Sequence, residues 1–213
     1  MRDLDVVRLV ERAPLRAVRW NDLTAELPNP ARTLARLAGR GALTRIARGV
    51  YVVPPGGADG QTWRPSLEVA ALALGTARFG ARQAILTGVG AARFWHAIPR
   101  AIAETTLAVP VPGRHPVQLD TGGVVRLVHR VLDRVDATLE STELGEALVA
   151  TRAQTLYDLL GRAGQGALAG EVAEAIANLR TRVAKEELVA VADRAERVPA
   201  AVTRMLGEWG DDV

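Results

Sequence analysis

Hydrophobic residues in the first fifty positions alternate between short helical and short extended patterns. Apolar residues at helical spacing predict a first helix over residues 4–10. An extended link is predicted at residues 15–18. A second helix is predicted around residues 21–27, where Pro28 ends it.

A third helix is predicted from Pro30 to about Gly39. Asn29 suits the N-cap position because its side chain accepts a hydrogen bond from a free backbone amide, and Pro30 suits the first turn. Leu34 and Leu37 fall on one side of this helix and form its expected core face.

Two β-prone segments follow this helix, at residues 43–47 and 50–53. The pair Arg48-Gly49 between them is suited to the tight turn of a hairpin. Helix, short strand, helix, turn, helix and two-stranded hairpin is the element order of a winged helix-turn-helix, in which the last helix enters the major groove of DNA. We therefore predict a DNA-binding domain of this type over residues 1–54.

Arginines line the side of the third helix opposite its leucines, at i, i+4 and i+8, and continue into the hairpin. No Asp or Glu occurs between residues 27 and 58, which indicates an unopposed positive patch for phosphate. The predicted DNA-binding residues are Arg32, Thr33, Arg36, Arg40, Arg45 and Arg48. The first three are expected in a major groove and the last three nearer the phosphates. The alternative is an ordinary solvated helix face, on which charges of both signs are usual.

Charge is unevenly distributed along the 213 residues. Residues 1–54 carry ten arginines against five acidic residues, whereas the remainder has a net charge of −2. We therefore expect the remainder to contribute little to DNA contacts. The absence of cysteine excludes disulfides and thiolate zinc sites. No apolar stretch is long enough for a membrane span and no signal core begins the chain, so a cytoplasmic protein without a membrane partner is expected.

Proline and glycine concentrate in residues 54–60, and we predict a linker at residues 55–65. Ser66 is the predicted N-cap of a helix that reaches about Gly75. The strand candidates beyond it are residues 83–86, 105–111, 117–119 and 124–131, and residues 138–149 are expected to continue the sheet. Helices are predicted at 91–98 and beyond residue 152. The predicted fold is α+β, with the winged helix-turn-helix followed by a mixed α/β domain over residues 66–213 that ends in a helical tail.

Three segments together resemble a known family. They are Arg48–Val53 (RGVYVV), Leu86–His96 (LTGVGAARFWH) and, more weakly, Ala150–Leu160 (ATRAQTLYDLL). They are similar to the AbiEi-type antitoxins of type IV toxin–antitoxin systems. The resemblance implies a protein that binds operator DNA, represses its own operon and counteracts a nucleotidyltransferase-like toxin. A homodimer on repeated half-sites is a possible form on DNA.

The sequence shows no pattern typical of catalysis. The glycines at residues 88 and 90 match no phosphate-binding fingerprint, so we favour close helix–strand packing there. The three histidines are dispersed, His96 is interpreted as a packing and capping residue, and Asp158 is either a buried polar anchor or an exposed helix charge. We expect no catalytic residue, cofactor or metal. Two alternatives remain, namely an enzyme with its active site in residues 66–213 and a winged-helix adaptor that binds an acidic protein.

Overall fold

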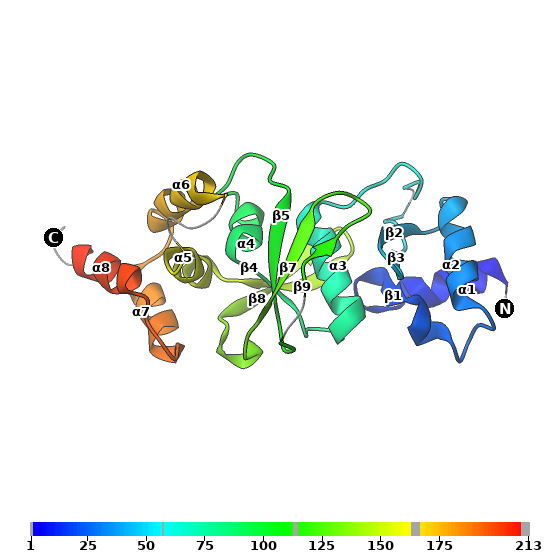
Figure 1. Ribbon diagram of the computed structural model, residues 1–213, viewed down its shortest axis with the longest axis horizontal. Helices are drawn as coiled ribbons and strands as arrows, with labels where there is room; N and C mark the ends of the chain where they lie inside the picture. The colour runs from blue at the N-terminus through cyan, green and yellow to red at the C-terminus, as the bar shows by residue number, and fades with distance from the viewer. Residues whose placement is uncertain (1, 57, 113–114, 163–166, 210–213) are drawn as a thin grey trace.

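The computed structural model describes residues 2–56, 58–112, 115–162 and 167–209. It has the predicted mixed α+β fold, which is confirmed. The molecule is elongated, with the N-terminal elements at one end, a six-stranded sheet in the middle and four helices at the other end (Figure 1).

The N-terminal unit, residues 2–53, combines helices with a small antiparallel sheet of order β1-β3-β2. Its elements are α1 (Asp3–Glu11), η1 (Pro14–Arg16), β1 (Ala17–Arg19), η2 (Trp20–Leu23), α2 (Pro30–Gly39), β2 (Thr44–Ala47) and β3 (Val50–Val52). The first and third predicted helices and both arms of the hairpin therefore lie where the sequence pattern put them.

The second predicted helix is wrong, because residues 20–23 form only a short 3₁₀ turn. The side chain of Asp22 bonds Arg19, and the hydroxyl of Thr24 donates to the carbonyl of Asn21. Short polar side chains of this kind compete with helical backbone bonds. Leu23 alone is buried within the turn, so little apolar surface favours a longer helix.

The small sheet is buried on both faces. Val18, Tyr51 and Val53 pack with α1 and α2, whereas Ala17 and Val52 on the opposite face pack into the core of the central sheet. Successive residues of a strand point to opposite faces of the sheet. The unbroken apolar run of β3 is therefore typical of a strand that is buried on both faces.

The N-terminal unit and the residues that follow it share the core of the central sheet. Leu15, on η1, lies against β9 (Gly145–Ala150), and α3 (Leu67–Phe79) packs against η1 and β1. The backbone amide of Asp120 also donates to the carbonyl of Ile46 in β2 at 2.9 Å. The N-terminal unit is thus bonded and packed against the rest of the molecule.

The segment predicted as a linker is fastened to the N-terminal unit. The amide of Gly60 donates to the carbonyl of Gly41 at 3.0 Å, and the hydroxyl of Thr44 donates to the carbonyl of Gly60 at 3.1 Å. A Cβ at Gly60 would lie 2.6 Å from the Gly41 oxygen, so only glycine fits this approach. The predicted division into a domain over residues 1–54, a linker over residues 55–65 and a domain over residues 66–213 stays a prediction.

The central sheet has the order β6-β7-β5-β4-β9-β8 and is mixed, with β4 antiparallel to β5 and parallel to β9. Its remaining elements are β4 (Ile85–Thr87), α4 (Gly88–Phe94), β5 (Glu104–Val109), β6 (Val117–Gln118), β7 (Val124–His129), η3 (Leu132–Arg134) and β8 (Ala137–Thr142). Residues 138–149 continue the sheet as expected, in the form of the hairpin of β8 and β9, which turns at residues 143–144.

The C-terminal part is helical, as predicted, and packs against α4 through its first helix. It comprises α5 (Arg152–Leu160), α6 (Ala169–Arg180), α7 (Lys185–Arg194) and α8 (Ala200–Glu208), which bury a second core with Val89 and Ala92 of α4. Among the described residues, no helix combines the length and the apolar character needed to cross a membrane.

Close helix–strand packing explains Gly90 of α4, whereas Gly88 has a φ of +54° and no close contact. A Cβ at Gly90 would lie 2.1 Å from the hydroxyl oxygen of Thr105 in β5 and 2.8 Å from a methyl group of Leu86. The packing interpretation of this glycine-rich segment is therefore confirmed at Gly90. Helix α4 begins three residues earlier than the predicted helix and ends before His96.

Candidate nucleic-acid interface and a buried polar network

Helix α2 presents one apolar and one basic side, as its sequence predicts. The Asn29 side chain accepts a hydrogen bond from the amide of Arg32 at 3.2 Å and caps the helix. Leu34 and Leu37 are buried, whereas Arg32 and Arg36 are exposed. Thr33 is half-buried at the border of the two sides.

The basic side of α2 is not unopposed, and that part of the prediction is wrong. Arg36 makes two hydrogen bonds, of 2.6 and 2.7 Å, to the carboxylate of Asp3 on α1, and Arg40 approaches the same group at 3.4 Å. The hydrogen bond from Arg36 holds the pKa of Asp3 below its usual range, and Asp3 raises the pKa of Arg36. The acid comes from a helix about thirty residues earlier, so the local sequence gives no sign of it.

Arg45 on β2 is paired as well. Its guanidinium bonds the carboxylate of Asp120 in the loop between β6 and β7. This ion pair ties the hairpin to the central sheet. Of the six predicted residues, Arg32 and Arg48 are the arginines without an acidic partner within the described part of the chain.

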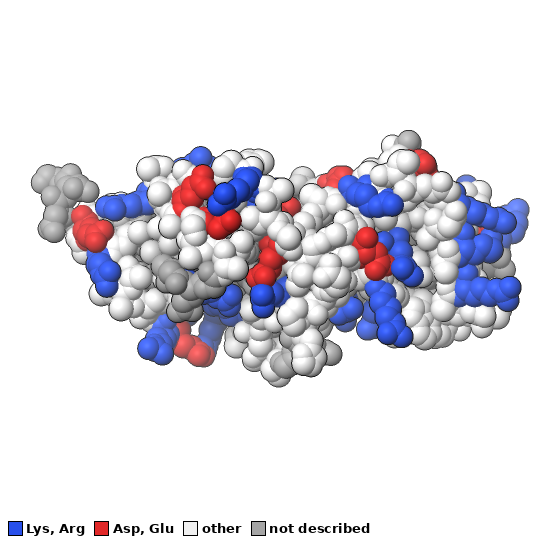
Figure 2. Space-filling model, turned by 45° about the horizontal axis from the view of Figure 1, so that its top comes forward, with Lys and Arg blue, Asp and Glu red and all other residues white. Residues whose placement is uncertain are grey.

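Arginine still dominates the N-terminal end of the molecule. Figure 2 shows basic side chains gathered over the N-terminal unit, whereas basic and acidic side chains alternate over the helical end. Because the Arg36–Asp3 and Arg45–Asp120 pairs are exposed to solvent, an incoming phosphate can exchange with the carboxylate at modest cost. This surface therefore retains the charge needed to bind a polyanion.

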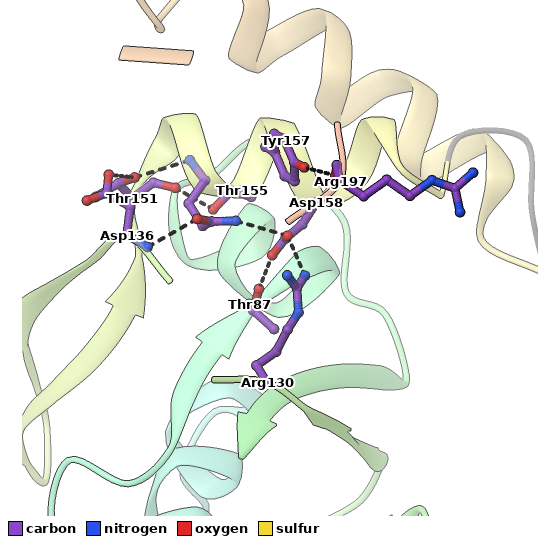
Figure 3. A network of polar contacts seen from close by, with 9 residues as sticks. Thr87, Arg130, Asp136, Thr151, Thr155, Tyr157, Asp158 and Arg197 are labelled. Carbon is purple, nitrogen blue, oxygen red and sulfur yellow. Dashed lines mark hydrogen bonds and ion pairs between the residues drawn. The ribbon is translucent and has the colours of Figure 1, made fainter. Parts of the chain in front are cut away.

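A second polar cluster lies inside the molecule, around Asp158 of α5 (Figure 3). Thr87 donates its hydroxyl to one carboxylate oxygen. Arg130 and Gln154 donate to the other oxygen at 2.5 and 3.0 Å. The Asp158 side chain is only 5% exposed. Of the two interpretations open from the sequence, the structure shows the buried polar anchor.

This cluster joins two of the segments that carry the family resemblance. Thr87 belongs to the segment Leu86–His96, and Asp158 belongs to Ala150–Leu160. The same two segments meet again where the Trp95 indole donates to the carbonyl of Ala150 at 2.8 Å. Arg152 lies over the Trp95 ring at 4.9 Å. These segments thus form one internal contact between α4 and α5.

Hollows of about 450 and 440 Å³ flank the network, and Arg130 and Asp158 line both. In the second hollow the other carboxylate, Glu104, is paired with Arg126. Burial raises the pKa of Tyr157 at the first hollow, and its hydroxyl donates to the carbonyl of Arg197 at 2.6 Å. Each of these groups therefore has a partner that fixes its position.

Sequence reasoning missed Arg130 as a member of the network. It follows the end of β7 and lies 28 residues before Asp158. No local pattern connects the two positions, since the sheet brings them together. The only usable signal was Asp158 among the apolar positions Leu156, Leu159 and Leu160, because a charge needs a partner once it is buried.

His96 terminates α4, which confirms the capping part of its interpretation, but the residue is exposed, so the packing part is wrong. Its φ of +56° places it in the left-handed region. The amide of His96 donates to the carbonyl of Arg93, and the amide of Ala97 donates to the carbonyl of Ala92 at 2.8 Å. These two bonds form a Schellman motif, in which the left-handed position is more often glycine.

The fold defined by these elements is a mixed α+β fold that occurs in a solved structure. The crystal structure of the RV2827C protein from Mycobacterium tuberculosis matches 95% of this chain and 74% of its own, with a TM-score of 0.59. The two sequences are 17% identical, so the likeness concerns the fold alone. No family model matches the chain, and no curated protein sequence matches it.

Proposed function

We propose that this protein is a DNA-binding antitoxin that represses its own type IV toxin–antitoxin operon. In this proposal the N-terminal unit is a winged helix-turn-helix, with α2 as the recognition helix and the β2–β3 hairpin as the wing. The sheet and the C-terminal helices pair two copies on DNA and counteract a nucleotidyltransferase-like toxin. The proposed partners, DNA and the toxin, and the proposed function rest on the family resemblance together with the basic side of α2.

The observation that carries the DNA-binding half is the exposed basic side of α2. Arg32 lies in the first turn without an acidic partner in the described chain, and Arg36 is one turn further along, bonded to a solvent-exposed carboxylate. The N-terminal turns of a recognition helix are the part that contacts base edges. The guanidinium fork fits the two acceptors of guanine and also fits phosphate.

The antitoxin part of the proposal is supported by the contact between the two segments Leu86–His96 and Ala150–Leu160, which resemble the AbiEi-type antitoxins. The Thr87–Asp158 bond and the Trp95–Ala150 bond show that these segments build one contact. Such a contact gives the second part of the chain a defined shape, which a protein-binding or self-pairing surface needs. The localisation proposed with this function is the cytoplasm, where operator DNA is available.

DNA binding is tested with duplex DNA from the region directly upstream of the gene and with a scrambled duplex of equal composition. We expect the double variant Arg32→Ala, Arg36→Ala to lose its preference for the upstream duplex, because a bidentate arginine–guanine contact is worth about 1–3 kcal/mol of discrimination. Arg204→Ala on α8 is the matched control and should behave like the wild type. Equal preference in the double variant and the wild type would contradict the assignment.

Toxin control is tested by co-expression with the product of an adjacent nucleotidyltransferase-like gene. The full chain should restore growth. The Arg32→Ala, Arg36→Ala variant, which no longer represses, should still restore growth when both genes are expressed from unrelated promoters. If neither protein restores growth, the antitoxin part of the proposal is wrong, while DNA binding is judged separately from the titration.

A further inference from the structure

A small basic hollow lies where the β2–β3 turn meets the end of α3. It has a volume of about 260 Å³, and its lining includes Trp20, Arg48, Gly49 and Arg78. These residues come from η2, the hairpin turn and the last turn of α3. We call the three side chains Trp20, Arg48 and Arg78 the hairpin cluster. It is the place where the N-terminal unit and the rest of the chain offer basic groups side by side.

Trp20 is fixed beside the hairpin turn but not buried. Its backbone amide donates to the carbonyl of Gly49 at 3.1 Å. A Cβ at Gly49 would lie 3.0 Å from the indole ring, and Gly49 has a φ of +78°. The ring therefore lies directly over the turn, yet the residue remains 42% exposed. A large apolar ring held in this way at a basic surface offers a rigid contact at little cost in conformational entropy.

Arg48 gives the hollow a positive charge that no carboxylate of the described residues pairs with. Arg19, which also lines it, is bonded to Asp22 at 2.7 Å and is balanced by that carboxylate. Arg48 has no acidic partner among the described residues, and Arg78 adds a second guanidinium from α3. An anion that enters the hollow meets guanidinium groups from two sides of the junction.

We propose that the hairpin cluster binds the sugar–phosphate backbone of duplex DNA, with Arg48 and Arg78 on phosphate oxygens and Trp20 against the neighbouring sugar. This inference rests on the proposed function and deepens it. It assigns a phosphate contact to α3, and so replaces the sequence-based expectation that residues beyond 54 add little to DNA binding. Guanidinium groups bind phosphate through paired, charge-assisted hydrogen bonds.

The position of the hollow favours a contact with the DNA backbone over a contact with the bases. A recognition helix reads base edges, and flanking elements hold the phosphates on either side. Both η2 and the hairpin flank α2, because η2 and β2 each pack against that helix. The cluster is therefore expected to act on all sequences alike. Loss of one such contact lowers the slope of log affinity against log salt by about one.

The test compares Arg78→Gln, Arg78→Lys and the control Arg204→Gln in full-length protein, on the upstream duplex and on the scrambled duplex. Arg78→Gln should weaken binding to both duplexes equally and lower the salt slope by about one. Arg78→Lys should keep most of the affinity, because lysine still provides a point charge. Arg204→Gln lies on α8, at the opposite end of the molecule (Figure 1), and should match the wild type.

A second measurement follows Trp20 directly. The tryptophan emission of the wild type should change on titration with either duplex, and Trp20→Phe should lose that change while Trp63, Trp95 and Trp209 remain. An unchanged salt slope in Arg78→Gln, or an unchanged emission response in Trp20→Phe, would overturn the cluster as a DNA contact. Binding by the wild type would then still support the proposed function. If the wild type binds neither duplex, both proposals fail.

Discussion

The basic surface of the N-terminal unit and the Asp158 network use the same chemistry in opposite settings. The Arg36 and Asp3 side chains are 41% and 45% exposed, whereas Arg130 and Asp158 are 38% and 5% exposed. The first pair remains hydrated and can exchange partners. The second has lost the water around its carboxylate and depends on its protein donors. Exposure, more than the type of ion pair, therefore separates a surface suited to binding from a contact that holds the fold.

This difference predicts where substitutions act. Changes at the exposed pairs should alter affinity for a polyanion and leave the free energy of unfolding nearly constant, since exposed pairs contribute little to stability. Changes at the buried network should lower stability and leave the DNA-binding surface intact. Each of the following experiments measures either stability or DNA affinity, so that each half of the comparison can be contradicted.

The largest effect on stability is expected from Asp158→Asn. The substitution removes the charge that Arg130 and Thr87 bind, and we expect a loss of about 1.5–3 kcal/mol in the free energy of unfolding. The measurement is chemical denaturation, with the exposed Asp133→Asn as control. A double-mutant cycle with Arg130→Gln should give a coupling of the same sign. A cycle without coupling would show that the pair is not a structural unit.

A smaller effect, on binding alone, is expected from Asp3→Asn. The substitution removes the carboxylate that Arg36 and Arg40 contact, so both guanidinium groups become available to phosphate. Affinity for duplex DNA should rise, and its salt dependence should steepen by about one. Asp5→Asn, on the same helix and with the same change in charge, is the control. Equal gains in both variants would mean that net charge, not release of α2, is responsible.

The smallest effect concerns pH. The pKa of Asp3 is lowered from its ordinary value of 3.8, mainly by the hydrogen bond from Arg36. A carboxyl with a lowered folded-state pKa contributes stability above its unfolded pKa and loses it as the pH falls through the folded value. The wild type should thus melt slightly above Asp3→Asn at neutral pH, and the difference should vanish in acid. A difference in melting temperature that grows on acidification would contradict a stabilising Asp3–Arg36 pair.

The sequence predicted the elements with strong local signals. Asn29 and Ser66 cap α2 and α3 as expected, and Gly90 is the close contact that its setting indicated. The α+β class followed from the change in hydrophobic period along the chain. These features depend on neighbours within a few residues, so a pattern in the chain is sufficient to find them.

The misses depend on contacts between distant residues. The Asp3–Arg36 and Arg45–Asp120 pairs join positions 33 and 75 residues apart. An acid-free stretch therefore suggested free arginines where the fold supplies carboxylates from elsewhere. The close approach of Gly60 to Gly41 likewise joins positions that no local pattern connects, and the linker predicted around it stays a prediction.

The core shared through Leu15 and Val52 has a consequence for cooperativity. Units that bury apolar surface in common cannot unfold separately without exposing it to water. We expect the N-terminal unit and the central sheet to melt in one transition. By linkage, a partner that binds only the folded sheet then also raises the population of the folded N-terminal unit, without any movement at the surface where that partner is held.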